Sequence, residues 1–304
     1  MLLSEAIEAL CIATRANGRS PRTVDSYREK LGHLRDFVGD LPIEEITTND
    51  LRRYIVEQRS RLSPFTVLTR ARAMKRLFNW LQEEGEIDHN PAERIKTPTP
   101  KRKEPKAISQ SDFEALLSTT EKGGLYDLRD RAIMLFLRDT GCRAKGLCTL
   151  KVDNLRLKAG LALVTEKRDK TRFAMFLPGT ADALREWLEV RPKDEEGYVF
   201  LNIRKKTHLK PTGVWQMLDR RAKRAGVEGP TGPHSFRHAF AKDYLLSGGD
   251  LASLSEILGH SDVRVTADWY AIFAIRELQE KHRRHSPAAR IFDRESEESD
   301  PKAS

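Results

Sequence analysis

The stretch GPHSFRHAF, residues 232–240, packs two histidines and an arginine into five positions among apolar residues. On a helix, His234 and Arg237 are three residues apart and project from neighbouring points of one face. Phe236 and Phe240 are four apart and are predicted to turn another face toward a core. Such a helix is either ordinary surface or the holder of something anionic, and the rest of the chain decides between the two.

Length and charge narrow the class of protein. A chain of 304 residues favours two domains. Apolar residues make up 39% of it, which is enough for real cores. The formal net charge is +9, and such an excess favours a polyanionic partner, above all nucleic acid.

The cysteines and the hydropathy exclude several classes. Cys11, Cys142 and Cys148 form no CxxC pair, so neither a disulfide framework nor a zinc site is predicted. A reducing, cytoplasmic location is the simplest expectation. No apolar run approaches the ~18 residues of a membrane span. The first ten residues carry Glu5 and Glu8 and do not resemble a signal peptide.

The first ~95 residues predict a small helical bundle, because apolar residues recur at three-to-four spacing after recognisable caps. The expected helix starts are Ser4, Ser20-Pro21, Thr48 and Ser63-Pro64. Residues 59–76 contain six Lys or Arg and no acid. They are either a solvated face or a helix laid against DNA phosphates. The candidate DNA contacts there are Arg70, Arg72, Lys75 and Arg76.

A proline-rich, basic segment, TPTPKRKEPKA at 97–107, cannot sustain a helix and marks a domain boundary. Its bases Lys101, Arg102 and Lys103 are further candidate DNA contacts. An α/β mixture follows, in which GLALVTE and TRFAMFLP are strand-like and KRDK joins them as a hairpin. The tail from residue 291 is acidic and poor in apolar residues, and it is expected to be disordered.

Separate segments of the second half supply residues in a characteristic order. TGCR gives Arg143, EKRDK gives Lys167, HSFRH gives His234 and Arg237, and LGHSD is followed by a tyrosine. This series resembles the signature of the tyrosine recombinases, the phage integrases and Xer-type recombinases. The resemblance implies six catalytic residues: Arg143, Lys167, His234, Arg237, His260 and Tyr270.

The resemblance covers nearly the whole chain and implies a fold. That fold is mainly α with a small antiparallel β-sheet. A helical, SAM-like core-binding domain would occupy 1–96, a linker 97–106, an α/β catalytic domain 107–290 and the tail 291–304.

The chemistry gives each residue type a reason. Preorganised cations can stabilise a phosphoryl transition state, so neither metal nor cofactor is expected. By resemblance, Arg143 and Arg237 clamp the non-bridging oxygens, while His234 helps the tyrosine to lose its proton. Also by resemblance, His260 donates a hydrogen bond to the phosphate. Tyr270 would become linked to the DNA 3′-phosphate.

Alternatives exist for several roles. By resemblance, Lys167 protonates the leaving 5′-oxygen, and Lys170 is its rival, although the spacing from Arg143 favours Lys167. Lys170 and Arg172 are expected to be exposed hairpin bases that contact the DNA backbone, and the alternative for either is plain surface. Tyr244 is a rival nucleophile, more simply a packed tyrosine. His238 is interpreted as a structural histidine.

Two positions depart from the family pattern. Many relatives carry a glutamate three residues after the first arginine, where this chain has Gly146, so how Arg143 is held is an open question. Tyr270 follows His260 by ten residues rather than nine. Tyr270 is nevertheless the only tyrosine beyond His260.

The predicted function is site-specific DNA recombination. The partner would be double-stranded DNA with specific sites, bound by a homotetramer across two sites that exchanges strands through a Holliday junction. The rivals are a type IB topoisomerase and a degenerate relative that only binds DNA. The target sequence, and the choice between mobile-element integration and dimer resolution, are left open by the sequence.

Overall fold

The computed structural model describes residues 1–100, 105–165, 171–193 and 196–259 together with positions 282 and 286. The chain forms two compact units, Met1–Lys103 and Glu104–Ser304. The boundary between them falls within the proline-rich segment, and the exact domain limits given above stay predictions. None of the helices in the described ranges is long and apolar enough to cross a membrane.

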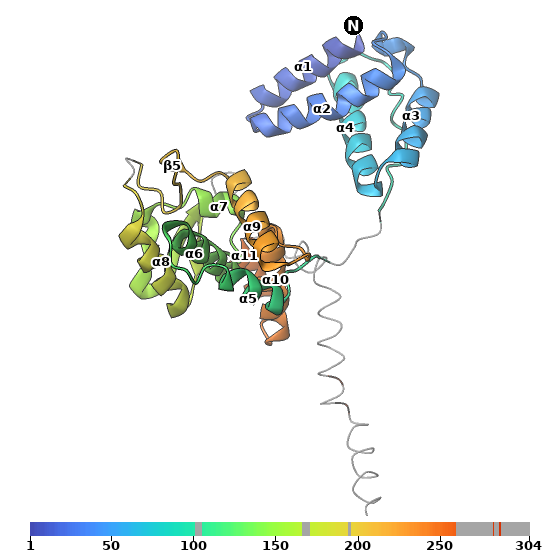
Figure 1. The fold of residues 1–304 in the computed structure, drawn as a ribbon. Coiled ribbons are helices and arrows are strands. Elements are labelled where there is room, and N and C mark those ends of the chain that lie inside the picture. The colour runs from blue at the N-terminus through green and yellow to red at the C-terminus, as the bar shows by residue number, and fades with distance from the viewer. Residues whose placement is uncertain (101–104, 166–170, 194–195, 260–281, 283–285, 287–304) are drawn as a thin grey trace, which may run out of the picture. The chain divides into compact units, whose positions relative to one another are not determined.

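The first unit is a helical bundle, as predicted (Figure 1). Its elements are α1 (Leu3–Ala16), α2 (Pro21–Val38), the 3-10 turn η1 (Ile43–Glu45), α3 (Thr48–Arg61) and α4 (Pro64–Glu83). Their inner faces share one core, in which Leu31, Met74 and Phe78 are completely buried.

The expected helix starts are correct for α2 and α4, where a serine occupies the N-cap position and Pro21 or Pro64 the first turn. Only Ser63 accepts a capping hydrogen bond, from the Thr66 backbone. The cap of α3 is Thr47 rather than Thr48. Thr47 accepts a hydrogen bond from the Asp50 backbone, and the Asp50 carboxylate accepts one from the Thr47 backbone at 3.0 Å. This reciprocal capping box explains the one-residue shift.

Ser4 does not cap α1, contrary to expectation. The N-cap position belongs to Leu2, and Ser4 lies within the helix. The Ser4 hydroxyl donates to Asp40 at 2.8 Å, and its backbone N–H donates to the same carboxylate at 2.8 Å. A carboxylate distant in sequence therefore receives the donors of this first turn.

The second unit is mostly helical and contains two small antiparallel sheets, which confirms the predicted fold class. Its helices are α5 (Gln110–Ser118), α6 (Leu125–Thr140), α7 (Ala144–Cys148), α8 (Pro178–Val190), α9 (Pro211–Ala225), α10 (Pro233–Leu246) and α11 (Leu251–Leu258), with the 3-10 turns η2 (Val152–Asn154) and η3 (Leu157–Ala159). Its strands are β1 (Leu155–Arg156), β2 (Leu161–Thr165), β3 (Thr171–Met175), β4 (Leu201–Asn202) and β5 (Thr207–His208).

The two strand-like segments pair as expected. β2 and β3 run antiparallel, with Val164 opposite Arg172, and β1 adds to the other edge of β2. Alternate residues of the pair are buried, among them Ala162, Val164 and Ala174. One face of this sheet therefore belongs to the core.

Helix α6 is central to the second unit and packs against α8 and α10 (Figure 1). Its residues Ile133 and Phe136 are completely buried. The Phe136 ring lies 5.9 Å from Phe176, directly after β3, and 6.4 Å from Phe200, directly before β4, so residues next to both sheets close the core around it. Because α6 is held on several sides, its C-terminal end is a fixed point for the residues that follow.

Candidate active site

The turn between α6 and α7 carries Arg143 and depends on a glycine. Gly141 ends α6 in the left-handed region, with φ 57°. A Cβ at Gly141 would lie 2.7 Å from Phe240 and 2.8 Å from Leu258, so α10 and α11 approach too closely for any other residue. Arg143 follows as the half-buried N-cap of α7. The first expected catalytic arginine thus lies where several helices meet.

Arg237 links this turn to the end of α11. Its side chain is only 5% exposed. Its Nη1 donates to the Gly141 carbonyl at 2.7 Å, and its Nη2 donates to the Leu258 carbonyl at 2.7 Å. Both carbonyls belong to helix ends, where backbone acceptors have no partner within the helix. One guanidinium therefore satisfies two helix ends and fixes their separation.

His234 lies in the first turn of α10 and is electrostatically close to both arginines. Partial burial lowers the pKa of His234 below its usual 6.5, and the charges of Arg237 and Arg143 lower it further. The imidazole is therefore neutral at pH 7, which is the form that accepts a proton. The structure thus brings together three of the six residues predicted to be catalytic.

Arg172 does not lie on an exposed face of the hairpin, and that expectation was wrong. It shares the inner face of β3 with Ala174, and its Nη2 is buried. Its Cδ would be 2.9 Å from a Cβ on Gly259, so its stem lies across that glycine. Burial lowers the pKa of Arg143, and the neighbouring charge of Arg172 lowers it further. Arg172 therefore belongs to the same basic region, and its contact with DNA stays a prediction.

Other predicted site residues lie outside the described ranges: Lys101, Arg102, Lys103, Lys167, Lys170, His260 and Tyr270. Two of these residues, His260 and Lys167, nevertheless follow closely after described elements. α11 ends at Gly259, whose φ of 65° is left-handed, directly before His260. β2 ends at Thr165, two residues before Lys167. The roles of these seven residues stay predictions.

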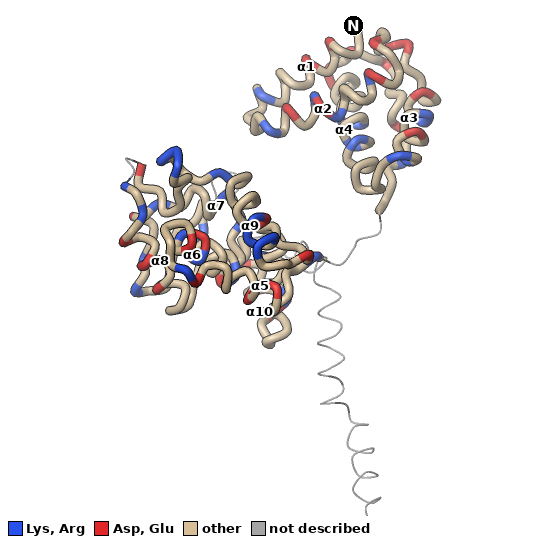
Figure 2. Tube along the Cα trace, viewed as in Figure 1, with Lys and Arg blue, Asp and Glu red and all other residues tan. Residues whose placement is uncertain are grey.

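Helix α4 carries several Lys and Arg residues (Figure 2), and their side chains differ in their hydrogen-bond partners. Three of them donate within their own unit: Arg70 to Gln58, Lys75 to the carbonyls of Glu93 and Ile95, and Arg76 to Glu83. Arg72 is exposed and makes no such contact with the described residues. Arg72 is therefore the member of this set best placed for a phosphate.

The rival nucleophile Tyr244 is a packed residue. Its ring lies 6.0 Å from that of Phe240, and a Cβ on Gly249 would meet Tyr244 Cε1 at 2.1 Å. His238 lies on the same helix beside the site. Burial lowers the pKa of His238, and the charges of His234 and Arg237 lower it further. Its structural role stays a prediction.

The Cα of Gly146 points toward Val164 and Thr165 of β2. A Cβ on Gly146 would lie 3.1 Å from Cys142 Sγ and 3.5 Å from the Thr165 carbonyl. A glutamate there would need its neighbours to move. The orientation of Arg143 therefore depends on other contacts.

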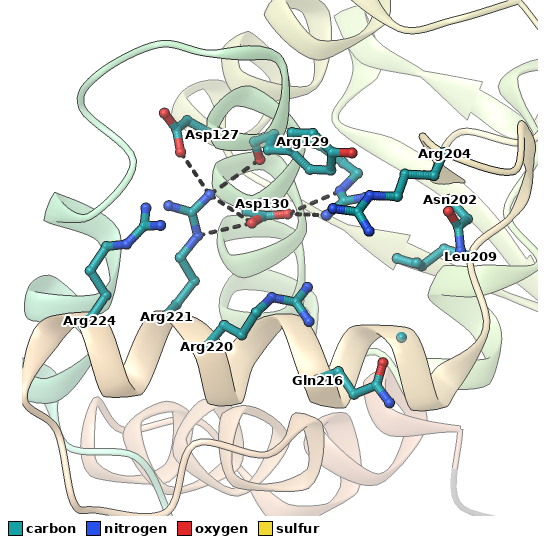
Figure 3. Close-up of a pocket in the computed structure, with 12 residues that line it drawn as sticks. Asp127, Arg129, Asp130, Asn202, Arg204, Leu209, Gln216, Arg220, Arg221 and Arg224 are labelled. Atoms are coloured by element: carbon teal, nitrogen blue, oxygen red, sulfur yellow. Dashed lines mark hydrogen bonds and ion pairs between the residues drawn. The ribbon is translucent and has the colours of Figure 1, made fainter.

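A separate pocket of about 630 Å³ lies between α6, α9 and the β4–β5 ribbon (Figure 3). Its inner wall is an ion-pair network in which Asp130 accepts from Arg221 at 2.7 Å and from Arg129 at 2.7 Å. Arg221 also pairs with Asp127 at 2.7 Å, and Arg129 donates to the Leu201 carbonyl at 3.2 Å. These buried cations are bound to protein acceptors, so the network is structural: it ties α6 to α9 and β4.

The described ranges offer no group of three His, Cys, Asp or Glu arranged to hold a metal ion. All three cysteines are buried free thiols. What the described part of the site does hold is a neutral imidazole and guanidinium groups, which suit the binding of a phosphate.

Comparison with known proteins covers both units. Residues 106–274 match the phage integrase family, and residues 14–85 match the phage integrase N-terminal SAM-like domain. The tyrosine recombinase XerD of Listeria monocytogenes is 31% identical over 284 residues, which cover 90% of this chain and 95% of XerD. The tyrosine recombinase XerC of Alcanivorax borkumensis is 33% identical over 253 residues, 81% of this chain and 82% of XerC.

Solved structures share the fold. The Tn1549 transposon integrase, in complex with transposon right end DNA, superposes with a TM-score of 0.77 at 19% identity, over 92% of this chain and 99% of that chain. XerH site-specific recombinase, bound to a palindromic difH substrate, superposes with a TM-score of 0.74 at 21% identity. The match covers 92% of this chain and 84% of the XerH chain. With both domains matched and relatives more than 30% identical along most of its length, the chain belongs to the phage integrase family of tyrosine recombinases.

Proposed function

We propose that this recombinase cuts and rejoins double-stranded DNA at specific sites through a covalent phosphotyrosine at Tyr270. Site-specific recombination itself follows from membership of the family. The relatives whose structures contain recombination-site DNA support DNA as the partner. The proposal adds the residue roles, the covalent intermediate and the assembly.

The chemistry is a pair of transesterifications. The Tyr270 hydroxyl oxygen attacks the phosphorus and forms a P–O bond, while the bond from phosphorus to the 5′-oxygen breaks. The tyrosine proton passes to neutral His234, and Lys167 supplies a proton to the leaving 5′-oxygen. Because the phosphodiester energy is kept in the phosphotyrosine, the reverse attack by a 5′-hydroxyl reseals DNA without ATP.

The observation that carries the proposal is the convergence of Arg143, His234 and Arg237 at the junction of α6, α7, α10 and α11. Arg237 bridges Gly141 and Leu258, so the Arg143 turn and the segment leading to His260 are held together. Two guanidinium groups at one place can stabilise the charge that spreads over the phosphoryl oxygens in the transition state. Protein contacts support both positions in the absence of DNA, because Arg143 is the N-cap of α7 and Arg237 of α10 is bonded to two helix-end carbonyls.

The test is to trap the covalent adduct. A DNA substrate nicked close to the cleavage point loses its 5′-hydroxyl fragment, so the phosphotyrosine accumulates and can be counted on a denaturing gel. We expect the wild type to form the adduct and Tyr270→Phe to form none while binding the same DNA with similar affinity. Normal adduct levels in Tyr270→Phe would show that another residue is the nucleophile.

The proposed assembly is a homotetramer on two DNA sites, exchanging strands in pairs through a Holliday junction. A two-site recombination assay distinguishes this from a type IB topoisomerase, which would relax supercoiled DNA as a monomer. Failure of the wild type to form any adduct would instead favour a relative that only binds DNA.

A further inference from the structure

We propose that Arg172 is a positioning residue of this active site, which holds Arg143 and the end of α11 in their working arrangement. The inference rests on the recombinase function proposed above. It gives this chain an alternative to the glutamate that many relatives carry at the position of Gly146. It also assigns Arg172 a role other than the exposed DNA contact expected from the sequence.

The strand register directs Arg172 inward. Arg172 lies opposite Val164 on β2, and it shares its face of β3 with Ala174, which is completely buried. Its neighbours Thr171 and Phe173 are exposed, as alternation along a strand requires. The side chain of Arg172 is correspondingly half-buried, and its Nη2 has essentially no exposed surface.

The stem of Arg172 meets the end of α11. A Cβ at Gly259 would be 2.9 Å from its Cδ, 3.4 Å from its Nε and 3.9 Å from its Cγ. The stem therefore lies flat over the residue that ends α11. The preceding carbonyl, that of Leu258, is the one that accepts from Arg237. Arg172 and Arg237 thus hold consecutive residues of the same helix end.

The guanidinium of Arg172 also lies in the neighbourhood of Arg143. The charge of Arg172 acts on Arg143, and both arginines interact electrostatically with Cys142. Cys142 in turn packs at Gly146, which rests on Val164 and Thr165 of β2. A continuous set of contacts therefore runs from the Arg143 turn through the sheet to Arg172 and on to the end of α11.

The contacts of its guanidinium favour positioning over direct contact. Nη1 of Arg172 donates to the Phe173 carbonyl at 3.3 Å, and Nη2 has essentially no exposed surface. Arg172 is therefore expected to act on the reaction through the placement of its neighbours. Its loss should slow cleavage without weakening DNA binding.

The experiment compares Arg172→Gln with Arg156→Gln, an exposed arginine of β1 in the same sheet. Single-turnover cleavage of the nicked substrate and DNA affinity over a salt series are measured for each. We expect Arg172→Gln to cleave about 10²-fold more slowly, the cost of a small misplacement of catalytic groups. Its affinity and salt slope should match those of the wild type and Arg156→Gln. A salt slope shallower by about one would mean a phosphate contact and would overturn the proposal.

A double-mutant cycle with Arg143→Ala tests whether Arg172 acts through Arg143. If it does, adding Arg172→Gln to Arg143→Ala should cost less than roughly threefold further, because the two residues act as a unit. A full additional loss would mean an independent effect and would refute positioning through Arg143. Cleavage by Arg172→Gln at the wild-type rate would refute it equally.

Controls separate this inference from the proposed function. Absence of adduct with the wild type would defeat the function itself. Adduct with the wild type, loss with Arg143→Ala and no effect of Arg172→Gln would defeat only the role of Arg172.

If circular dichroism shows Arg172→Gln unfolded, Arg172→Lys replaces it in the comparison, because lysine keeps the aliphatic stem and the positive charge. It lacks the planar fork, so we expect cleavage roughly tenfold slower at unchanged affinity. Wild-type cleavage by Arg172→Lys would then count against the proposal.

Discussion

At the scale of single residues, the two arginines of the site differ in what holds them. Arg237 is buried and bonded to two helix-end carbonyls, whereas Arg143 is a half-buried N-cap. Arg237 therefore has a structural function in addition to the proposed clamp on phosphate. The difference can be measured, because stability and cleavage are separate readouts.

Arg143→Ala and Arg237→Ala should each slow single-turnover cleavage by about 10²- to 10³-fold, the typical loss of one transition-state donor. Only Arg237→Ala should also destabilise the fold, by roughly 1–3 kcal/mol for each carbonyl left without a donor. Urea unfolding gives the second quantity. Equal stability of the two variants would show that the Gly141 and Leu258 carbonyls find other donors.

The histidine of the site predicts a pH dependence. Because burial and the charges of Arg237 and Arg143 lower the pKa of His234, the acidic decline of cleavage, where the imidazole becomes protonated, should set in at lower pH than for an ordinary histidine. The same lowered pKa favours the folded state above pH 6.5, and that contribution is lost as pH falls through the folded-state pKa. His234→Asn should cleave slowly at every pH without this acidic decline.

His238→Asn is the control for that measurement, since it removes a neighbouring imidazole without removing the proposed proton acceptor. It should retain the acidic decline. If His234→Asn keeps the decline and His238→Asn loses it, the proton acceptor is His238.

Among the helices, the ion-pair network of Figure 3 joins α6, whose end leads to Arg143, to α9. Asp130 of α6 lies between Arg129 and Arg221, and all three side chains are buried. α9 contacts α7, whose N-cap is Arg143. The network therefore supports the site from a distance, through the position of whole helices.

Asp130→Asn should destabilise the second unit by roughly 3–5 kcal/mol, because it leaves two buried guanidinium groups without their shared carboxylate. Calorimetry should show the corresponding transition at a lower temperature. Asp219→Asn is the matched control on α9, where Asp219 pairs with exposed Lys223 at 2.8 Å. An exposed pair of this kind contributes about 0.3–0.5 kcal/mol. Similar effects of the two substitutions would contradict the structural role of the network.

At the scale of the whole molecule, the net charge of +9 is distributed over two units with separate cores. Charge that is paired within a unit is less available to a polyanion. On α4, this leaves Arg72 as the exposed base, while Arg70, Lys75 and Arg76 have acceptors in their own unit. The count of basic residues in the stretch 59–76 thus exceeds the number placed to meet DNA.

Arg72→Gln should therefore weaken DNA binding and reduce the slope of log affinity against log salt by roughly 0.9, the contribution of one phosphate contact. Arg76→Gln, whose side chain pairs with Glu83 at 3.0 Å, is the comparison and should change the slope less. Titrations of a fluorescent duplex at several salt concentrations give both slopes. No change with Arg72→Gln would mean that this face of α4 is solvated in the complex.

Most helices and the family could be predicted from local patterns in the chain. Ser20-Pro21, Ser63-Pro64 and Gly141 act on residues within one turn, so their effects can be read locally, and the β2–β3 hairpin is equally local. The ordered motifs indicated the recombinase fold and function, which the comparisons confirm. Even so, a local choice such as Thr47 over Thr48 was decided by a capping box with a neighbouring aspartate.

Which charged side chains face inward depends on the packing of segments that are distant in sequence, and it could not be predicted locally. Arg237 meets Gly141 across 96 positions of sequence, and Arg172 meets Gly259 through the packing of β3 against α11. A single sequence shows that these residues are basic, and charge alone places them on the surface. Close packing of helix ends instead creates buried carbonyls that require hydrogen-bond donors. The buried guanidinium of Arg237 supplies those donors.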